Sequence, residues 1–372
     1  MKNKVFIILL IFTLNSCAIT YNSPHPPRSA VYTRSIPNLS GYVTLFCDFH
    51  MHTVFSDGYV WPTVRVDEAY YEGLSAIAIT DHIERRIFLS NFFDSLNTSY
   101  QEALKSQNAK ELIIIKGVEI TRDMPPGHFN AIFLTDADKL YYDKDNYINA
   151  FRAAKEQKAF ISWNHPGWEK QQPHSTIWMK EHNQLYEDGM MQGIEVANSG
   201  TYFPEAHQWA IEKNLTMMGG TDQHLPMPVF AQGEHRTMTL VFARERTAES
   251  IYEALMERRT AVYLKEYIIG ENKYLNELFE KSINVEITKN KNSAEITFRN
   301  NTELKFYLKK DRHDPRLSYL RFYNLESYII KPYSKQTITV LFSDNNISGD
   351  VNIIVENFII EPNTPMKYTI KI

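Results

Sequence analysis

Two histidines occupy alternate positions at the end of a hydrophobic run, in the stretch CDFHMHTVFSDGYVWP (residues 47–62). Successive side chains of a β-strand point to opposite faces, so we expect His50 and His52 to point the same way. Two imidazoles on one face suit a shared metal ion, and Asp57 on the following loop could add a carboxylate oxygen. Taken alone, this pair fits a structural role equally well.

Five further junctions between a strand and a loop carry a histidine, an aspartate or a glutamate. The motifs are ITDH, GVEI, GHFN, NHPGW and GTDQH, and they contain Asp81, His82, Glu119, His128, His165, Asp222 and His224. Each residue has a structural explanation, such as a helix cap at Asp81 or a buried, hydrogen-bonded histidine at His165. Because six junctions share one chemistry, the sequence favours a site built from strand ends.

Other polar residues near these junctions leave two interpretations open. Asp48 and Asp81 flank histidines and either orient them or serve turns and caps. Arg122, three residues after Glu119, either grips a phosphate through its guanidinium or is a solvated surface residue. Four aromatic residues after strand ends either line a substrate pocket or belong to the core: Trp163, Trp168, Tyr202 and Phe203.

The remaining histidines are assigned structural or surface positions. His235 and Arg236 enter a strand at its N-terminal end, away from the expected site, so we predict a structural role for them. His174, His182 and His207 lie in helical or loop stretches without partner spacing. We predict these three at the surface.

The elements that must hold the strand-end residues alternate along the chain. Between Gly41 and about Lys265, short β-branched runs (YVTLF, SAIAIT, LIIIKGVEI, FNAIFL, AFISW, GIEVAN, TMTLVFA) are separated by helical stretches such as VRVDEAYYEG, YINAFRAAKEQ, PEAHQWAIEKN and AESIYEALMER. Such alternation predicts an α/β fold with a parallel sheet, and about seven repeats suit a closed or nearly closed barrel.

The pattern changes at about Glu271. From there on, β-rich segments follow one another with Asn, Asp, Ser and Pro between them and no helical period, which predicts an antiparallel β-sandwich. The expected organisation is a signal peptide with lipobox at 1–17, a linker at 18–40, a barrel at 41–268 and a sandwich at 271–372.

The motifs HMHTVFSDG, ITDH, GVEI, GHFN, NHPGW and GTDQH, in this order, resemble those of the PHP family, the polymerase and histidinol phosphatase superfamily of metal-dependent phosphoesterases. The resemblance covers residues 43 to about 260. It implies a distorted (β/α)7 TIM-like barrel, the PHP fold, with up to three metal ions at the C-terminal ends of the strands. Here a small all-β sandwich domain would follow.

The resemblance also implies a role for each matching residue. One metal ion would be held by His50, His52, Glu119 and Asp222. Glu119 would bridge to a second ion, which His128 and His165 would also hold. The third ion would be held by Asp57, His82 and His224, with Asp57 standing where some members have histidine. The expected catalytic residues are Glu119, Asp222 and Arg122.

These ligands are all imidazoles and carboxylates, which suits two to three divalent ions of manganese, zinc or iron per chain. Two ions ~3.5–4 Å apart lower the pKa of a bridging water towards ~7 and neutralise charge on phosphoryl oxygens. The predicted function is therefore hydrolysis of phosphate mono- or diesters of small organic molecules by a metal-activated hydroxide.

The first residues, MKNKVFIILLIFTLNSC, carry two lysines and an apolar stretch that is too short to span a bilayer. They are typical of a signal peptide. Leu14 to Cys17 resembles the lipobox of bacterial lipoproteins, apart from Asn15. We expect an exported lipoprotein, anchored by lipid at Cys17 on the periplasmic face of a membrane, with a freely secreted form as the alternative.

The net charge of −4, from 40 basic and 44 acidic residues, comes without a run of like charges, so we do not expect nucleic acid as a partner. One alternative function is amidohydrolase-like hydrolysis of a non-phosphate bond, although GVEI presents Glu119 where amidohydrolases usually have a bridging lysine. Another is a non-catalytic binding lipoprotein whose sandwich contacts a glycan or a partner. Exposed aromatic residues in a groove would be needed to argue for sugar binding.

Overall fold

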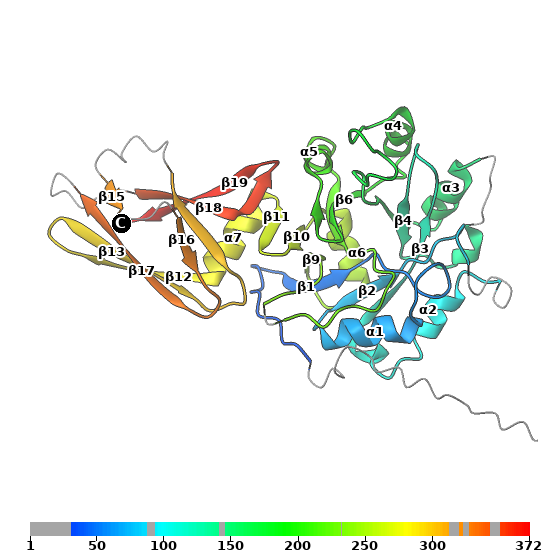
Figure 1. Cartoon of the computed structure of the whole chain (residues 1–372), viewed down its shortest axis with the longest axis horizontal. Helices are drawn as coiled ribbons and strands as arrows, with labels where there is room; N and C mark the ends of the chain where they lie inside the picture. The colour runs from blue at the N-terminus through cyan, green and yellow to red at the C-terminus, as the bar shows by residue number, and fades with distance from the viewer. Residues whose placement is uncertain are drawn as a thin grey trace, which may run out of the picture.

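The computed structural model describes residues 31–87, 94–140, 146–231, 233–311, 320–322, 327–342 and 350–372. The predicted signal peptide, Cys17 and the first part of the predicted linker lie outside these residues. The chain forms two bodies along its long axis, an α/β barrel-like domain and a β-sandwich (Figure 1). In the described part of the chain, no helix has the length and apolarity that crossing a bilayer requires.

The barrel-like domain is built on short, mostly buried strands. Their bounds are β1 Val43–Asp48, β2 Ala76–Ile79, β3 Ile113–Ile120, β4 Phe129–Ile132, β5 Phe160–Trp163, β6 Gly193–Asn198, β7 Thr201–Tyr202, β8 Thr216–Gly220, β9 Met238–Ala243, β10 Thr260–Leu264 and β11 Tyr267–Gly270. Neighbours follow in the order β11-β10-β9-β1-β2-β3-β4-β5-β6, and β8 also pairs with β6.

The sheet is mixed, so the prediction of a parallel sheet was wrong in part. β1, β2 and β3 run parallel, as do β5, β6 and β8. β4 is antiparallel to both of its neighbours, β9 is antiparallel to β1, and β10 is antiparallel to β9. This arrangement matters for the site, because the first residues of β4 and β9 lie at the same end as the last residues of β1.

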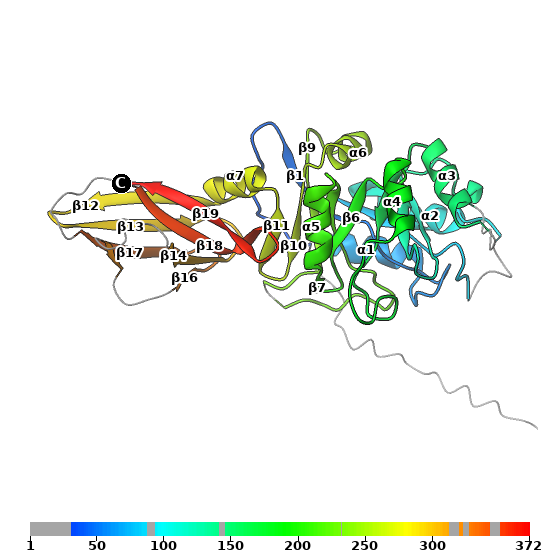
Figure 2. The same cartoon turned by 90° about the horizontal axis from the view of Figure 1, so that it is seen from above.

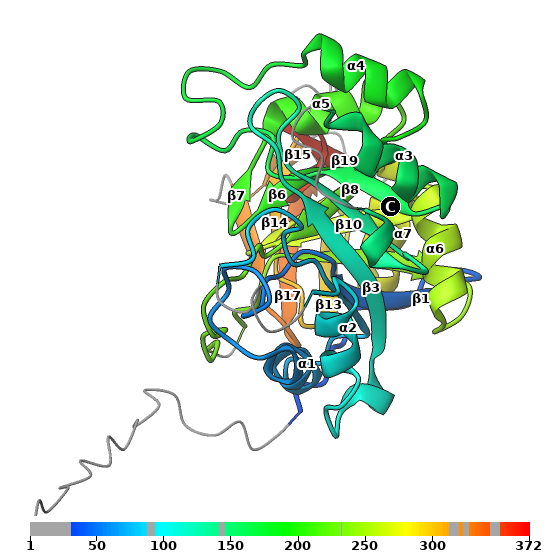
Figure 3. The ribbon, with the colours of Figure 1, turned by 90° about the vertical axis from the view of Figure 1, so that its right-hand side faces the viewer.

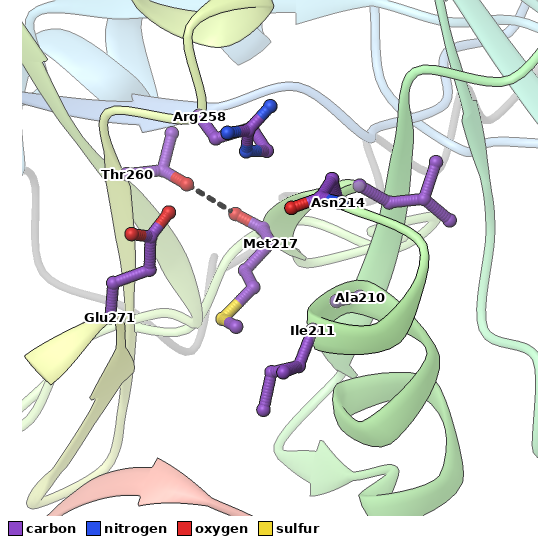
Figure 4. A pocket seen from close by; sticks show the side chains of 8 residues that line it. Ala210, Ile211, Asn214, Met217, Arg258, Thr260 and Glu271 are labelled. Atoms are coloured by element: carbon purple, nitrogen blue, oxygen red, sulfur yellow. Dashed lines mark hydrogen bonds between the residues drawn. The ribbon is translucent and has the colours of Figure 1, made fainter.

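Threonine hydroxyls link β8 to β9 and β10 and so close the barrel. Thr239 on β9 donates a hydrogen bond to the Gly219 carbonyl and accepts one from the Gly219 amide, both at 2.9 Å. Thr260 on β10 donates to the Met217 carbonyl at 2.9 Å. Figure 4 shows this last bond in a small pocket where β8 begins, at the end of the barrel opposite to Asp222 and His224.

Helices surround the strands of the barrel (Figure 3). They are α1 Pro62–Tyr71, α2 Thr98–Ala103, α3 Ile148–Glu156, α4 Lys180–Glu187, α5 Pro204–Glu212 and α6 Ala248–Met256, with short 3₁₀ turns at Ala109–Glu111 and Ala137–Lys139. Pro62 and Pro204 stand in the first turns, where the missing N–H costs no hydrogen bond. The four predicted helices are present as α1, α3, α5 and α6, whereas α2 and α4 were not predicted.

The C-terminal domain is the predicted β-sandwich. One sheet has the order β12-β13-β17-β15, and β16, β14, β18 and β19 form the other. The bounds are β12 Ile283–Lys289, β13 Ser293–Asn300, β14 Phe306–Lys310, β15 Leu320–Phe322, β16 Ser327–Ile330, β17 Lys335–Phe342, β18 Asp350–Glu361 and β19 Thr364–Lys371. Burial alternates along β13 and most of β18, as expected when one face of each sheet covers a shared core.

The two domains share one sheet, because β18 of the sandwich pairs in parallel with β11. Helix α7 (Asn272–Ser282) lies at this junction, between the barrel and the sandwich strands (Figure 2). The prediction of no helical period after Glu271 was therefore wrong. Tyr274, Leu275, Leu278 and Phe279 are spaced as on one helix face, and all four are buried in a core that both domains share.

Residues 31–40, which composition assigned to the linker, pack along the same junction. Ile36 and Leu39 are buried in the shared core. The amide of Tyr32 donates to the Tyr71 carbonyl at 2.8 Å, and Arg34 forms an ion pair with Glu303 at 3.2 Å. This segment therefore joins α1 of the barrel to the sandwich.

Candidate metal centre

The nine predicted ligands converge at one end of the barrel, and each is placed there by the end of a strand. His50 and His52 follow β1, His82 follows β2, and Glu119 is the next-to-last residue of β3. His128 precedes its strand, but β4 runs antiparallel to β3, so its first residues lie at the same end. The others come after β1, β5 and β8: Asp57, His165, Asp222 and His224.

Glu119 lies at the centre of this cluster and is fully buried. One carboxylate oxygen, Oε1, is 3.2 Å from His128 Nδ1, 3.5 Å from His50 Nε2 and 3.6 Å from His165 Nε2. The other oxygen, Oε2, is 2.6 Å from His82 Nδ1 and 3.6 Å from His52 Nε2. The two oxygens of this carboxylate therefore lie close to different groups of imidazoles.

Two aspartates complete the cluster on either side. Asp222 Oδ1 is 3.0 Å from His52 Nε2 and 3.2 Å from His50 Nε2. Asp57 Oδ1 is 3.1 Å from His224 Nε2 and 3.3 Å from His82 Nε2. The potential ligand atoms form four groups, each within 4.8 Å: His52, Asp57, His82 and His224; His50, His165 and Asp222; His50, His52 and Glu119; Glu119, His128 and His165.

The electrostatics of the cluster follow from burial and from these close pairs. Burial raises the pKa of Glu119, but the imidazoles of His82 and His128 hold it well below its usual value. Burial lowers the pKa of His82, yet the carboxylates of Glu119 and Asp57 raise it to about 10. Burial and the neighbouring His82 lower the pKa of His52 to about 4. The cluster thus keeps its carboxylates ionised and requires positive charge beside them.

The chemistry of the donor atoms fits bound metal ions. Within the described part of the chain, several buried atoms at the centre have no hydrogen-bond partner of acceptable geometry: His50 Nε2, His52 Nε2, Asp57 Oδ1, Glu119 Oε2 and His128 Nδ1. Buried polar atoms are rarely left in this state, because desolvation without a partner is costly. Nitrogen and oxygen atoms directed at one another in this way suit divalent cations.

Glu195 is a supporting residue that sequence reasoning missed. It lies on β6 and accepts a hydrogen bond from His50 Nδ1 at 2.8 Å, which leaves Nε2 directed at the cluster. It also accepts from the backbone amide of His165 at 2.8 Å and from the side chain of Asn198 at 2.9 Å. The available signal was a single charged residue, a glutamate, inside the buried strand GIEVAN.

Arg65 on α1 is a second supporting residue that was missed. Its buried guanidinium donates to the carbonyls of His52, Gln223 and Leu225 at 2.8–2.9 Å. It also pairs with Glu68 at 2.8 Å. The loops after β1 and β8 are therefore held together by one cation.

Asp48 and Asp81 hold loops, and no hydrogen bond to an imidazole ring is found for them among the described residues. Asp81 accepts from the amide of Thr53 at 2.7 Å and from the hydroxyl of Ser56 at 2.6 Å. Asp48 accepts from Thr221 at 2.7 Å and pairs with Arg236 at 3.0 Å. These contacts fix the backbone on both sides of the cluster.

Arg236 and His235 have the predicted structural roles, but not in the predicted place. Because β9 is antiparallel to β1, the residues before β9 lie at the same end of the barrel as the cluster. Arg236 is buried and also pairs with Glu72 at 2.7 Å. His235 packs on Tyr263, with ring centroids 3.7 Å apart.

Two of the three histidines predicted at the surface are buried. His182 stacks on Trp163 with ring centroids 3.8 Å apart and lies 2.7 Å from the Pro126 carbonyl. His207 lies 2.8 Å from the Tyr202 hydroxyl. His174 alone is exposed, as predicted. The prediction was wrong for His182, which packs on Trp163 of β5, and for His207, which packs beside Tyr202 of β7.

Arg122 lies beside the cluster and not within it. Its guanidinium forms an ion pair with Glu84. Burial raises the pKa of Glu84 to about 7, although Arg122 lowers it. Both residues line a cavity of about 590 Å³ that also contains His128, Trp168 and Lys170.

The four aromatic residues with open roles divide between core and pocket. Trp163 and Phe203 are buried in the barrel core. Trp168 lines the cavity beside the cluster, and its ring centroid is 5.2 Å from that of His165. Tyr202 lines a separate cavity near the junction.

Comparison with known proteins agrees with this architecture. A family model for an Ig-like domain matches residues 281–371. A solved structure from Bacteroides vulgatus, described as a two-domain protein containing a predicted PHP-like metal-dependent phosphoesterase, is 47% identical, with a TM-score of 0.87 over 92% of this chain and 99% of that chain. An uncharacterized protein of Methanocaldococcus jannaschii is 42% identical over 81 residues. This match covers 21% of the chain and 34% of that protein, so the chain spans about a third of the curated relative's length.

The barrel, with histidines and carboxylates at its strand ends, and the match to the Bacteroides vulgatus structure together indicate a PHP-like metal-dependent phosphoesterase. The chain belongs to this family, as a two-domain member with a C-terminal Ig-like domain. The resemblance found in the sequence motifs and the predicted β-sandwich are both confirmed.

Proposed function

We propose that the protein hydrolyses phosphate mono- or diesters of small organic molecules with two to three divalent metal ions. The observation that carries the proposal is the convergence of nine imidazole and carboxylate side chains, with buried donor and acceptor atoms directed at one another. Manganese, zinc and iron fit this donor set. When bound, such ions supply a nucleophile from water at neutral pH and neutralise charge on the phosphoryl oxygens.

The four groups of neighbouring ligand atoms support an assignment of side chains to these ions. His52, Asp57, His82 and His224 would hold one ion, and Glu119, His128 and His165 would hold another. His50 and Asp222 would hold a third, together with His52, His165 or Glu119. If Glu119 completes the third group, its carboxylate would be shared by two ions, and Asp222 lies close to both His50 and His52.

The cavity beside the cluster supports an organic phosphoester as the substrate. It shares His128 with the cluster, so a phosphoryl group at the metal ions would leave its organic group in this cavity. Trp168 offers a ring for that group to pack against, and Arg122 offers a guanidinium that suits phosphate oxygens. A ring beside the site favours an organic ester over free pyrophosphate.

The test combines metal analysis with hydrolysis of p-nitrophenyl phosphate and bis(p-nitrophenyl) phosphate, with manganese, zinc or iron(II) added. The expected result is two to three metal ions per chain and turnover that depends on them. Metal without turnover on either ester would favour hydrolysis of a non-phosphate bond. Absence of metal under all three conditions would contradict the assignment.

We also propose that the protein is exported and anchored by lipid at Cys17, with the barrel and the Ig-like domain on the periplasmic side. The proposal rests on the signal sequence and the lipobox-like Leu14 to Cys17. Mass spectrometry of the mature N-terminus should find a lipidated Cys17. An unmodified N-terminus beyond residue 17 would favour the secreted form.

A further inference from the structure

A second cavity lies at the junction of the barrel and the Ig-like domain, and the proposed hydrolysis does not use it. Its volume is about 640 Å³, within the ~300–1,000 Å³ range of small-molecule sites. Residues of both domains line it, among them Tyr32, Tyr263, Glu303, Tyr307, Ile329 and Tyr333. We refer to this cavity as the junction cleft.

Four of the residues that line the junction cleft are tyrosines, and neighbouring residues hold their rings in place. Tyr263 is buried against the ring of His235. Tyr32 lies under the guanidinium of Arg34, 4.5 Å from its ring centroid. The hydroxyls of Tyr307 and Tyr333 form hydrogen bonds with Glu266 and Ser35. Since these contacts fix the rings before any ligand arrives, little side-chain entropy remains to be lost on binding.

The charges around the junction cleft nearly balance, with Arg34 adding one cation to those of the lining. Three lysines and three glutamates line it. Lys305 pairs with Glu266, and the buried Glu303 pairs with Arg34 at 3.2 Å and accepts from the Ser35 amide at 3.0 Å. A site for phosphate or nucleic acid would present a surplus of positive charge. The balance therefore favours a ligand that is polar and uncharged.

A neutral sugar fits these features. Sugar rings have apolar C–H faces and hydroxyls around the edge, whereas tyrosine has an apolar face and a hydroxyl at its tip. Tyr333 is 61% exposed and Ile329 49% exposed, so the cleft also offers apolar surface at its mouth. We propose that the junction cleft is a binding site for neutral oligosaccharides.

The position of the junction cleft relates it to the metal centre. β9 is antiparallel to β1, with Thr239 opposite Cys47, and β10 is antiparallel to β9, with Tyr263 opposite Met238. The turn at Lys265 and Glu266 therefore lies at the same end of the barrel as the strand-end histidines. A glycan held in the cleft would be retained on the side where the metal centre opens. Binding itself does not depend on the proposed hydrolysis.

The test is calorimetric titration of the purified protein with maltotriose, cellotriose, mannotriose and tri-N-acetylchitotriose. At least one trisaccharide should bind, and Tyr333→Ala and Tyr307→Ala should each weaken that binding about tenfold, which corresponds to about 1.4 kcal/mol of ring contact. Tyr333→Phe keeps the ring and should retain most of the affinity.

The matched control is Tyr100→Ala, which removes a partly exposed tyrosine from α2, outside the junction cleft. It should bind as the wild type does. Metal-dependent hydrolysis of p-nitrophenyl phosphate reports on the folded state of every variant, and Tyr333→Ala should leave it unchanged. Absence of binding to all four sugars, or equal binding by the wild type and Tyr333→Ala, would overturn the proposal. Absence of hydrolysis by the wild-type protein would contradict only the function proposed for the metal centre.

Discussion

The metal centre and the domain junction both bury charged side chains, but they compensate the charge in different ways. At the junction, Arg34 and Glu303 are 6% and 5% exposed and form an ion pair with each other. At the metal centre, Glu119 and the imidazoles around it point at one another, and several of their atoms lack hydrogen-bond partners among the described residues. The first region is complete within the described residues, and the second has the donor atoms to bind an added cation.

This difference predicts how each region responds to substitution. A buried ion pair that loses one partner leaves an uncompensated charge and costs folding stability. A metal-binding carboxylate that loses its charge weakens the binding of the cation and the chemistry that depends on it.

Replacement of Glu119 by glutamine should abolish phosphoester hydrolysis and release metal. In the proposed assignment this carboxylate would be shared by two ions, and losing their stabilisation of the transition state would cost several kcal/mol, or more than about 10³-fold in rate. Turnover and metal content are measured together, with the exposed Glu205→Gln as the control. Full activity in Glu119→Gln would contradict a centre with more than one metal ion.

Replacement of Arg34 by methionine should lower the free energy of unfolding by about 3 kcal/mol, because Glu303 remains buried without its guanidinium. Urea denaturation measures the change. Arg244→Met is the matched control, since the Arg244–Glu253 pair is 65% and 40% exposed and such pairs contribute about 1 kcal/mol or less. Equal losses in the two variants would show that the junction pair is no more important than a surface pair.

Replacement of Glu195 by glutamine should weaken metal affinity and activity by about 10–100-fold. Glu195 accepts three hydrogen bonds, from His50, His165 and Asn198, so a glutamine NH₂ group would place a donor against a donor. Competition with a metal chelator measures the affinity, again with Glu205→Gln as the control. Unchanged affinity would mean that His50 needs no partner to orient its ring.

The convergence of the nine candidate ligands could be predicted from the sequence, because each lies at a strand end or in the loop beside it, within a recognisable motif. Glu195 could not, since a glutamate in the middle of a strand gives no local sign of the histidine that contacts it. The directions of β4 and β9 were also missed, because the hydrophobic pattern of a strand is the same in both orientations. Tertiary pairing alone decides which of its ends faces the metal centre.

The junction was harder to predict than the barrel for a related reason. The period of α7 is present in Tyr274, Leu275, Leu278 and Phe279, but its buried face is defined by contacts with both domains. The sharing of one sheet through β11 and β18 joins residues about 90 positions apart, such as Ile268 and Phe358. Burial of His182 likewise depends on Trp163, which follows from packing and not from the helix on which His182 lies.

The smallest effect concerns the pH dependence of stability that His182 causes. It distinguishes an imidazole packed in the core from those that would bind metal. Burial lowers its pKa to about 4, against ~6.5 in the unfolded chain. The unfolded chain therefore binds more protons between these values, and stability falls as the pH falls from about 7 towards 4. At pH 5 the lowered pKa of His182 reduces the free energy of unfolding by about 2 kcal/mol relative to neutral pH.

His182→Gln should therefore lose less stability than the wild type between pH 7 and pH 5, as measured by urea denaturation at each pH. The exposed His174→Gln should show the wild-type dependence. Because His182 bonds to the Pro126 carbonyl and not to a cluster carboxylate, the difference between wild type and His182→Gln should be the same with and without metal. A difference that disappears on metal removal would place His182 with the metal-binding imidazoles instead.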